Sequence, residues 1–154
     1  MNQPDAIKNY SHTQSAPLCL ILYGCALACL VVGAISGEAS GVVISGCVGL
    51  LIAMLGSCFH ELTVEDQGQV LSIHFGPVPL FRRTVNYVDM SNVEIGRTLL
   101  IDGWGIHRSI RGGWVWNLWG RDCVMVSFRN GQPLRIGTDD AENLLAFLRS
   151  QVHA

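Results

Sequence analysis

Two apolar runs dominate the first third of the chain, and neither contains an ionisable side chain. They extend from Pro17 to Ile35 and from Val42 to Phe59, and six residues rich in glycine and serine separate them. An α-helix needs roughly 20 apolar residues to cross the hydrocarbon core of a bilayer, with a lower limit of about 17. The pattern predicts a transmembrane hairpin (spans 17–35 and 42–59), preceded by an N-terminal tail over residues 1–16.

From residue 60 onward, apolar positions follow the two-residue period of β-strands. Side chains alternate cleanly between Val70 and Phe75, which is typical of a half-buried strand. Asn130-Gly131 is the strongest turn signal for a two-residue β-hairpin, and Val88 to Asn92 is predicted as a short helical or turn segment. The strand candidates are residues 62–64, 70–75, 80–85, 93–101, 104–110, 114–118, 123–128 and 134–136.

An amphipathic helix is predicted to close the chain. Asp139 can cap its start, with Glu142 three residues later. Its apolar stripe consists of Leu144, Leu145, Leu148 and Val152. Residues 60–154 are therefore expected to form one α+β domain, a curved antiparallel sheet or open barrel followed by a C-terminal helix.

Three short motifs resemble those of bacterial membrane-associated pleckstrin-homology-like (PH-like) domains of unassigned function. They are Phe75-Gly76-Pro77-Val78-Pro79 with Arg82-Arg83, then Gly103-Trp104-Gly105-Ile106, then Asn130-Gly131 with Ile136-Gly137-Thr138-Asp139-Asp140. The resemblance covers about residues 62–150, with departures at His107 and Ala141. It implies a PH-like fold beside one or two membrane spans in a bacterial cell membrane, and it implies no activity.

Charge and cysteine usage narrow the class of protein. The formal net charge is −2, which argues against nucleic acid as a partner. Five of the six cysteines lie in the apolar runs, only Cys123 lies outside them, and no C-x-x-C pair occurs. Cysteines in apolar surroundings behave as small hydrophobic residues, so we expect packing rather than zinc or redox chemistry.

Positive charges near the spans predict the orientation. Lys8 precedes the first span, the linker carries only Glu38, and Arg82 and Arg83 follow the second span. Cytoplasmic segments carry an excess of Lys and Arg, so a multi-pass protein of the plasma (inner) membrane with both termini cytoplasmic is expected.

The first apolar run could instead be a cleavable signal peptide, because Ala34-Ile35-Ser36 resembles a small-residue cleavage site. Two retained spans are favoured because both runs reach spanning length.

Small residues recur at four-residue spacing within the predicted hairpin. Gly33 and Gly37 form one pair, and Ser45, Gly49 and Ala53 form another row. Small residues let two membrane helices approach closely. The rows either pack the two helices of one hairpin together, which is the favoured interpretation, or form a face for a homodimer.

No catalytic or metal-binding motif stands out, and no catalytic residue, metal ligand or cofactor is expected. The remaining candidate is a lipid- or partner-binding segment rich in tryptophan and arginine. It consists of Trp104, Arg108, Arg111, Trp114 and Trp116. Tryptophan is enriched at membrane interfaces and arginine suits anionic headgroups, whereas core filling is the alternative role of these tryptophans.

These features together predict a non-enzymatic integral membrane protein that displays a cytoplasmic PH-like domain for binding protein or lipid. Membrane lipids, and a membrane-protein partner or second copy, are the expected partners. The alternative function is an accessory or scaffold subunit of a larger membrane complex, acting through its transmembrane hairpin.

Overall fold

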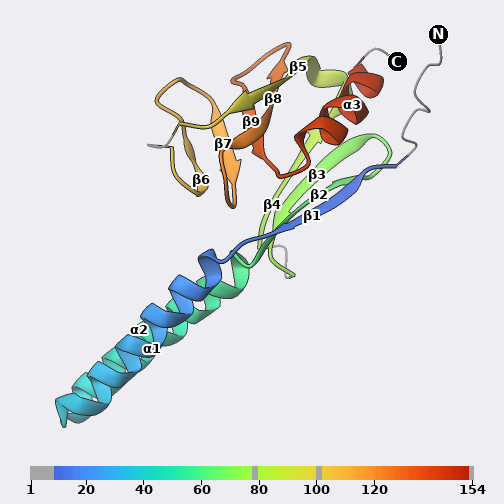
Figure 1. Ribbon diagram of the computed structural model, residues 1–154. Coiled ribbons are helices and arrows are strands. Elements are labelled where there is room, and N and C mark those ends of the chain that lie inside the picture. The colour runs from blue at the N-terminus through green and yellow to red at the C-terminus, as the bar shows by residue number, and fades with distance from the viewer. Residues whose placement is uncertain (1–8, 78–79, 100–101, 153–154) are drawn as a thin grey trace.

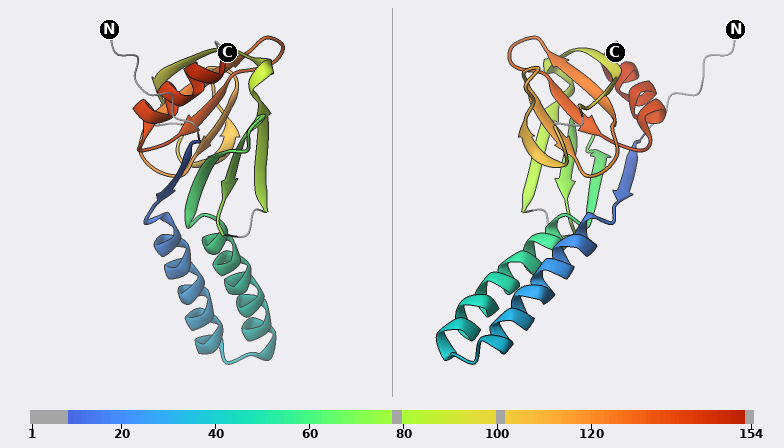
Figure 2. Two further views of the ribbon diagram at one scale, coloured as in Figure 1. Left: turned by 90° about the vertical axis from the view of Figure 1, so that its right-hand side faces the viewer. Right: turned by 60° about the vertical axis from the view of Figure 1, so that its left-hand side comes forward.

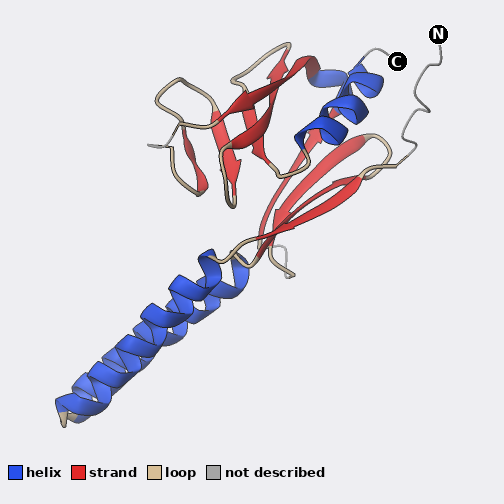
Figure 3. Cartoon of the chain, in the orientation of Figure 1, coloured by secondary structure: helices blue, strands red, loops and turns tan. Residues whose placement is uncertain are grey.

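The computed structural model describes residues 9–77, 80–99 and 102–152. A helical hairpin projects from one end of a domain that contains two β-sheets and a C-terminal helix (Figures 1 and 3). The α+β class predicted from the sequence is therefore confirmed, as is a helix at the C-terminal end of the chain.

The hairpin consists of α1 (Leu18–Ser36) and α2 (Ala39–Cys58). Both helices are long and apolar enough to cross a membrane, and most of their side chains are not buried within the protein. A core helix of a water-soluble domain would be mostly covered. Gly37 ends α1 with a positive φ of 68°, a conformation that glycine adopts at no steric cost.

Small residues hold the two helices close to each other. A Cβ added to Gly33 would lie 2.7 Å from the Cβ of Ser45. One added to Gly49 would lie 3.1 Å from the carbonyl oxygen of Ala26. Gly33, Ser45 and Gly49 are therefore used inside the hairpin, which agrees with the favoured of the two interpretations.

The first sheet has the strand order β1–β2–β3–β4, with every neighbouring pair antiparallel. Its strands are β1 (Ser11–Ser15), β2 (Glu61–Asp66), β3 (Val70–Phe75) and β4 (Phe81–Asn86). The hairpin is thus inserted between two adjacent strands, because β1 leads into α1 and α2 leads into β2.

Residues 1–16 are predicted as a tail, whereas the structure places residues 11–15 in the sheet. Ser15 pairs with Glu61 and Ser11 with Glu65. Tyr10, just before β1, is buried in the core. The sequence conceals this strand because its alternation is short and polar on both faces, so its membership depends on a partner strand about 50 residues away.

The second sheet has the order β5–β8–β9–β7–β6. A short 3₁₀ turn, Tyr87–Asp89, leads into it from β4. Its strands are β5 (Met90–Arg97), β6 (Gly105–Arg108), β7 (Trp114–Asn117), β8 (Asp122–Phe128) and β9 (Leu134–Gly137). β7 and β9 are parallel, which differs from the wholly antiparallel sheet expected. The β8–β9 hairpin lies between β5 and β7, so β7 pairs with β6 on one side and with β9, rather than β8, on the other.

The C-terminal helix α3 (Ala141–Val152) covers the end of the domain away from the hairpin (Figure 2). Leu144, Phe147 and Leu148 are fully buried, which confirms two positions of the predicted stripe and adds Phe147. The helix begins directly after Asp140 rather than Asp139. Both carboxylates instead contact the segment around β1: Tyr10 donates a hydrogen bond to Asp140 (3.2 Å), and His12 lies 2.6 Å from Asp139.

Candidate functional site

The five residues of the tryptophan- and arginine-rich segment do not form one patch. Trp104 precedes β6, whereas Arg111 lies in the turn between β6 and β7, at the opposite end of the strand. The start of β6 lies on the side of the domain from which the hairpin leaves, and the turn lies on the far side (Figure 1). Trp104 and Arg111 therefore cannot contact one membrane surface together when the hairpin is inserted.

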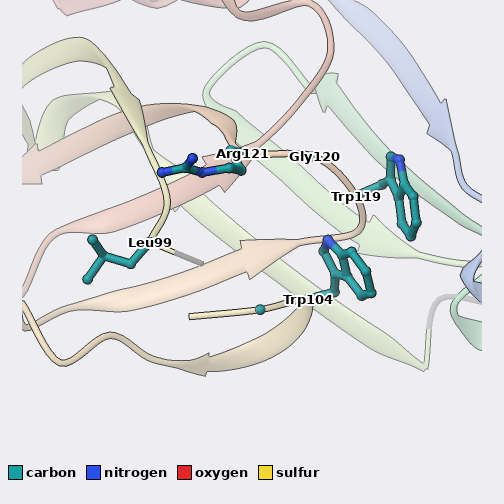
Figure 4. A pocket seen from close by; sticks show the side chains of 6 residues that line it. Leu99, Trp104, Trp119, Gly120 and Arg121 are labelled. Carbon is teal, nitrogen blue, oxygen red and sulfur yellow. The ribbon is translucent and has the colours of Figure 1, made fainter. Parts of the chain in front are cut away.

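Trp104 instead pairs with Trp119, which the predicted segment omits. Their rings stack with centroids 4.4 Å apart and planes 19° apart. The two indoles lie side by side at one end of a surface cavity of about 420 Å³ (Figure 4). The side-chain amide of Gln14, near the end of β1, donates a hydrogen bond to the Trp119 carbonyl at 3.3 Å. The tryptophan pair is thereby tied to the strand that leads into α1.

The other candidates share the inner face of the β6–β7 hairpin. Trp114 pairs with Arg108 and Trp116 with Ile106, so Trp114 and Trp116 lie on the same strand face, as predicted. Their environments differ, because Trp114 is 38% exposed and Trp116 is 7% exposed. Arg108 is exposed and donates a hydrogen bond to Gln132 at 2.9 Å.

This inner face forms one wall of a groove whose other wall is β4. We call it the β4 groove, and it encloses about 360 Å³. Its lining residues are Leu80, Phe81, Arg82, Arg83, Ile106, Trp114 and Trp116. Among the described residues that line it, none is acidic, and apolar side chains predominate.

Strand alternation separates the two arginines of β4. Arg83 pairs with Ile73, on the face that carries the buried core residues of β3, whereas Arg82 pairs with His74 on the other face. Arg82 donates hydrogen bonds to Ser72 at 3.2 Å and to Gln67 at 3.0 Å. Adjacent arginines in one strand thus have different surroundings, which is a direct consequence of the two-residue period.

Arg83 is a partly buried cation without a nearby counter-charge. Burial lowers the pKa of its guanidinium below the usual value because removal from water disfavours the charged form. Within residues 9–77, 80–99 and 102–152, no carboxylate lies within ion-pair distance of it. The groove therefore presents positive charge in a largely apolar setting.

Trp116 brings a second unsatisfied group to the same groove. Its indole nitrogen, Nε1, is buried and has no hydrogen-bond partner among the described residues. A tryptophan N–H can only donate a hydrogen bond, and a buried donor without an acceptor is unusual in native proteins. Two residues that line the β4 groove thus carry unpaired donor groups: Arg83 has no ion-pair partner among the described residues, and the enclosed Nε1 of Trp116 has no hydrogen-bond acceptor among them.

Aromatic contacts place the groove beside the C-terminal end of α2, where the helix joins the domain. Phe59, which follows α2, stacks on Phe81 with ring centroids 5.7 Å apart and also contacts Phe75 at 5.1 Å. Phe75 in turn contacts Trp116, with centroids 5.7 Å apart. A Cβ added to Gly76 would lie 2.8 Å from the Cys58 carbonyl oxygen, so the β3–β4 connection packs directly on the helix end.

Comparison with known proteins adds no family or activity: no protein-family model matches the chain, and no curated protein matches it significantly. In the described part of the chain, no three His, Cys, Asp or Glu side chains are grouped closely enough to hold a metal ion. The sequence reasoning missed Leu80, Phe81, Arg83 and Trp119 as site residues. The sequence did contain a signal for Arg83, namely the doublet Arg82-Arg83 within a predicted strand. Side chains alternate between the two faces of a strand, so one of the two arginines must face inward.

Proposed function

We propose that this protein is a non-enzymatic integral membrane protein whose hairpin holds a PH-like domain against the bilayer, where the domain binds lipid. The observation that carries the proposal is the short connection between helices and sheet. Ser15 of β1 and Glu61 of β2 are paired. α1 begins three residues after Ser15, and α2 ends three residues before Glu61. Such a connection leaves the domain little freedom to move away from the surface in which the hairpin is embedded.

The tryptophan pair supports contact with the interface. Trp104 is 46% exposed and directly precedes β6, whose start lies on the hairpin side of the domain (Figure 1). A Cβ added to Gly105, next to it, would lie 3.9 Å from the ring of Phe59 at the end of α2. Indole rings favour the headgroup region of a bilayer, so the stacked pair is suited to rest there.

The domain lies on the same side of the membrane as the N-terminal strand, because two spans return the chain to its starting side. The lysine before α1 and the absence of Lys and Arg from the linker support a cytoplasmic location for both. The motifs that resemble PH-like domains support the same class of fold, and the two-sheet arrangement with a C-terminal helix is compatible with it.

Fluorescence quenching by brominated lipids tests the contact between the domain and the bilayer. The full chain is reconstituted in phosphatidylcholine vesicles as the double variant Trp114→Phe/Trp116→Phe, which leaves Trp104 and Trp119 as its only tryptophans. We expect stronger quenching by lipids brominated close to the headgroup than by lipids brominated at the chain ends. Emission that neither lipid quenches would place the domain clear of the membrane and contradict the proposal.

Co-purification of the full chain from detergent tests the alternative accessory role. A stoichiometric protein partner would favour the accessory subunit, whereas bound lipid without such a partner would favour the lipid-binding domain. The two outcomes are distinguishable by mass spectrometry of the same preparation.

A further inference from the structure

We propose that the β4 groove binds one anionic phospholipid of the host membrane. Its phosphate is held by Arg83 and the indole N–H of Trp116, and its acyl chain lies along Leu80, Phe81 and Trp114. This proposal rests on the proposed function in one respect: the groove must open close to the bilayer surface. It goes further in naming the ligand class and the two side chains that recognise it.

Arg83 supplies the charge that selects an anion. An unpaired buried charge is unfavourable, and pairing with an opposite charge in a low-dielectric setting offsets that cost. A guanidinium can donate two parallel hydrogen bonds to a phosphate. Because burial is what lowers the pKa of Arg83, a bound phosphate would return that pKa toward its usual range.

Trp116 supplies a donor that fits the same ligand. Its Nε1 is buried without a partner in a side chain that is 7% exposed, and both Trp116 and Arg83 line the groove. Phosphate oxygens are acceptors, so a phosphate that reached both side chains would satisfy both groups. A zwitterionic or cationic headgroup would place a second positive charge near Arg83. The described residues that line the groove include no acidic side chain that would offset this charge.

The apolar lining favours a lipid over inorganic phosphate. Leu80 is 61% exposed and Phe81 is 37% exposed, and an acyl chain would cover both. Phe81 also stacks on Phe59 at the end of α2, so the lining begins where the hairpin leaves the membrane. A volume of about 360 Å³ lies within the range of small-ligand sites, roughly 300–1,000 Å³, and it accommodates a headgroup and the start of a chain.

Lipid retention by the full chain tests the site. The protein is exchanged into nonionic detergent micelles that contain equal amounts of phosphatidylglycerol and phosphatidylcholine. Native mass spectrometry then counts the lipids that remain bound. We expect the wild-type chain to retain one phosphatidylglycerol. We expect Arg83→Leu to reduce the retained fraction at least tenfold and Trp116→Phe to reduce it severalfold.

Arg149→Leu is the matched control, because it removes the same charge from an exposed position on α3 that does not line the groove. It should retain phosphatidylglycerol like the wild-type chain. Equal loss in both arginine variants would show non-specific attraction to surface charge and overturn the site, as would unchanged retention in Arg83→Leu. Should Arg83→Leu prove unfolded, Trp116→Phe and Arg83→Lys carry the test, and full retention in both would refute it.

Two further measurements separate the possible failures. Inorganic phosphate at millimolar concentration should not displace the lipid, and displacement would show that the groove recognises phosphate alone. Quenching of Trp104 and Trp119 by brominated lipid, measured in the Trp114→Phe/Trp116→Phe variant, should persist when Arg83→Leu is added. Quenching without selective retention by the wild-type chain would therefore refute the groove and keep the proposed function, whereas absence of quenching in the double variant itself would refute the proposed function.

Discussion

Tyr10 offers a direct test of whether the strand before the membrane hairpin belongs to the domain. Its side chain is 5% exposed and stacks on Phe147 of α3, with ring centroids 5.5 Å apart. Its hydroxyl donates a hydrogen bond to Asp140 at 3.2 Å. Tyr10→Ala removes the ring and the hydrogen bond, whereas Tyr10→Phe removes only the hydrogen bond.

The expected magnitudes follow from these contacts. Truncating a buried aromatic side chain to alanine costs about 3–5 kcal/mol when the cavity cannot collapse, and Phe147 is fixed on its other side by Tyr87 at 6.0 Å. The net worth of one intramolecular hydrogen bond is about 0.5–1.5 kcal/mol. Tyr10→Phe should therefore cost about 1 kcal/mol, and Tyr10→Ala at least three times as much.

The assay is urea unfolding of the full chain in detergent, followed by intrinsic fluorescence, with Ser11→Ala as a control at an exposed neighbour. The control should lie within about 0.5 kcal/mol of the wild-type chain. A cost below about 1 kcal/mol for Tyr10→Ala would show that the segment around β1 is not part of the core and would refute the reasoning.

Three other predictions concern the isolated domain, the pH dependence of stability and the orientation of the hairpin. Residues 61–154 alone should aggregate, because this fragment lacks β1, the partner strand of β2. Residues 9–16 joined to residues 60–154 by a short Gly-Ser linker should unfold cooperatively in urea. Cooperative unfolding of the fragment 61–154 would contradict the pairing of β1 with β2. Burial raises the pKa of Cys123 from 9.0 to about 11, so the thiol contributes stability below pH 9 that is lost as the pH rises toward 11. This contribution of Cys123 to the free energy of unfolding should fall by about 1 kcal/mol between pH 9 and pH 10, so Cys123→Ala should make the measured decrease smaller by that amount; an unchanged decrease would contradict the burial of the thiol. In intact cells a membrane-impermeant maleimide should label Glu38→Cys and miss Arg129→Cys, at an exposed position, and the reverse pattern would invert the proposed topology.

Much of the fold could be predicted because its signals are local. The hairpin follows from two uncharged runs, and α3 follows from an apolar stripe in which Leu144 and Leu148 are both fully buried. Most strands follow from alternation within a few residues. The parallel pairing of β7 with β9 has no local signal, because it arises only when the β8–β9 hairpin lies between β5 and β7.

The candidate site was predicted less well, for a related reason. Trp104 and Arg111 are close in sequence, and proximity in sequence suggested one surface, but a single strand carries them to opposite ends of the sheet. The groove instead joins Arg83 of β4 to Trp116 of β7, two residues whose strands belong to different sheets. Only the packing of the two sheets brings such residues together.

The insertion of the hairpin between β1 and β2 bears on the order in which the protein is made and assembled. The 45 residues between Ser15 and Glu61 would form a long loop if unstructured, and closing it would cost about 3 kcal/mol of chain entropy. Once α1 and α2 are paired, their ends are side by side, and β1 meets β2 as if a tight turn joined them. β1 is also synthesised before α1 and α2, and its partner β2 is made only after both helices. In the proposed membrane setting, insertion of the hairpin would therefore be the timing step for this domain, and a chain whose hairpin fails to insert should expose an unpaired β2 edge.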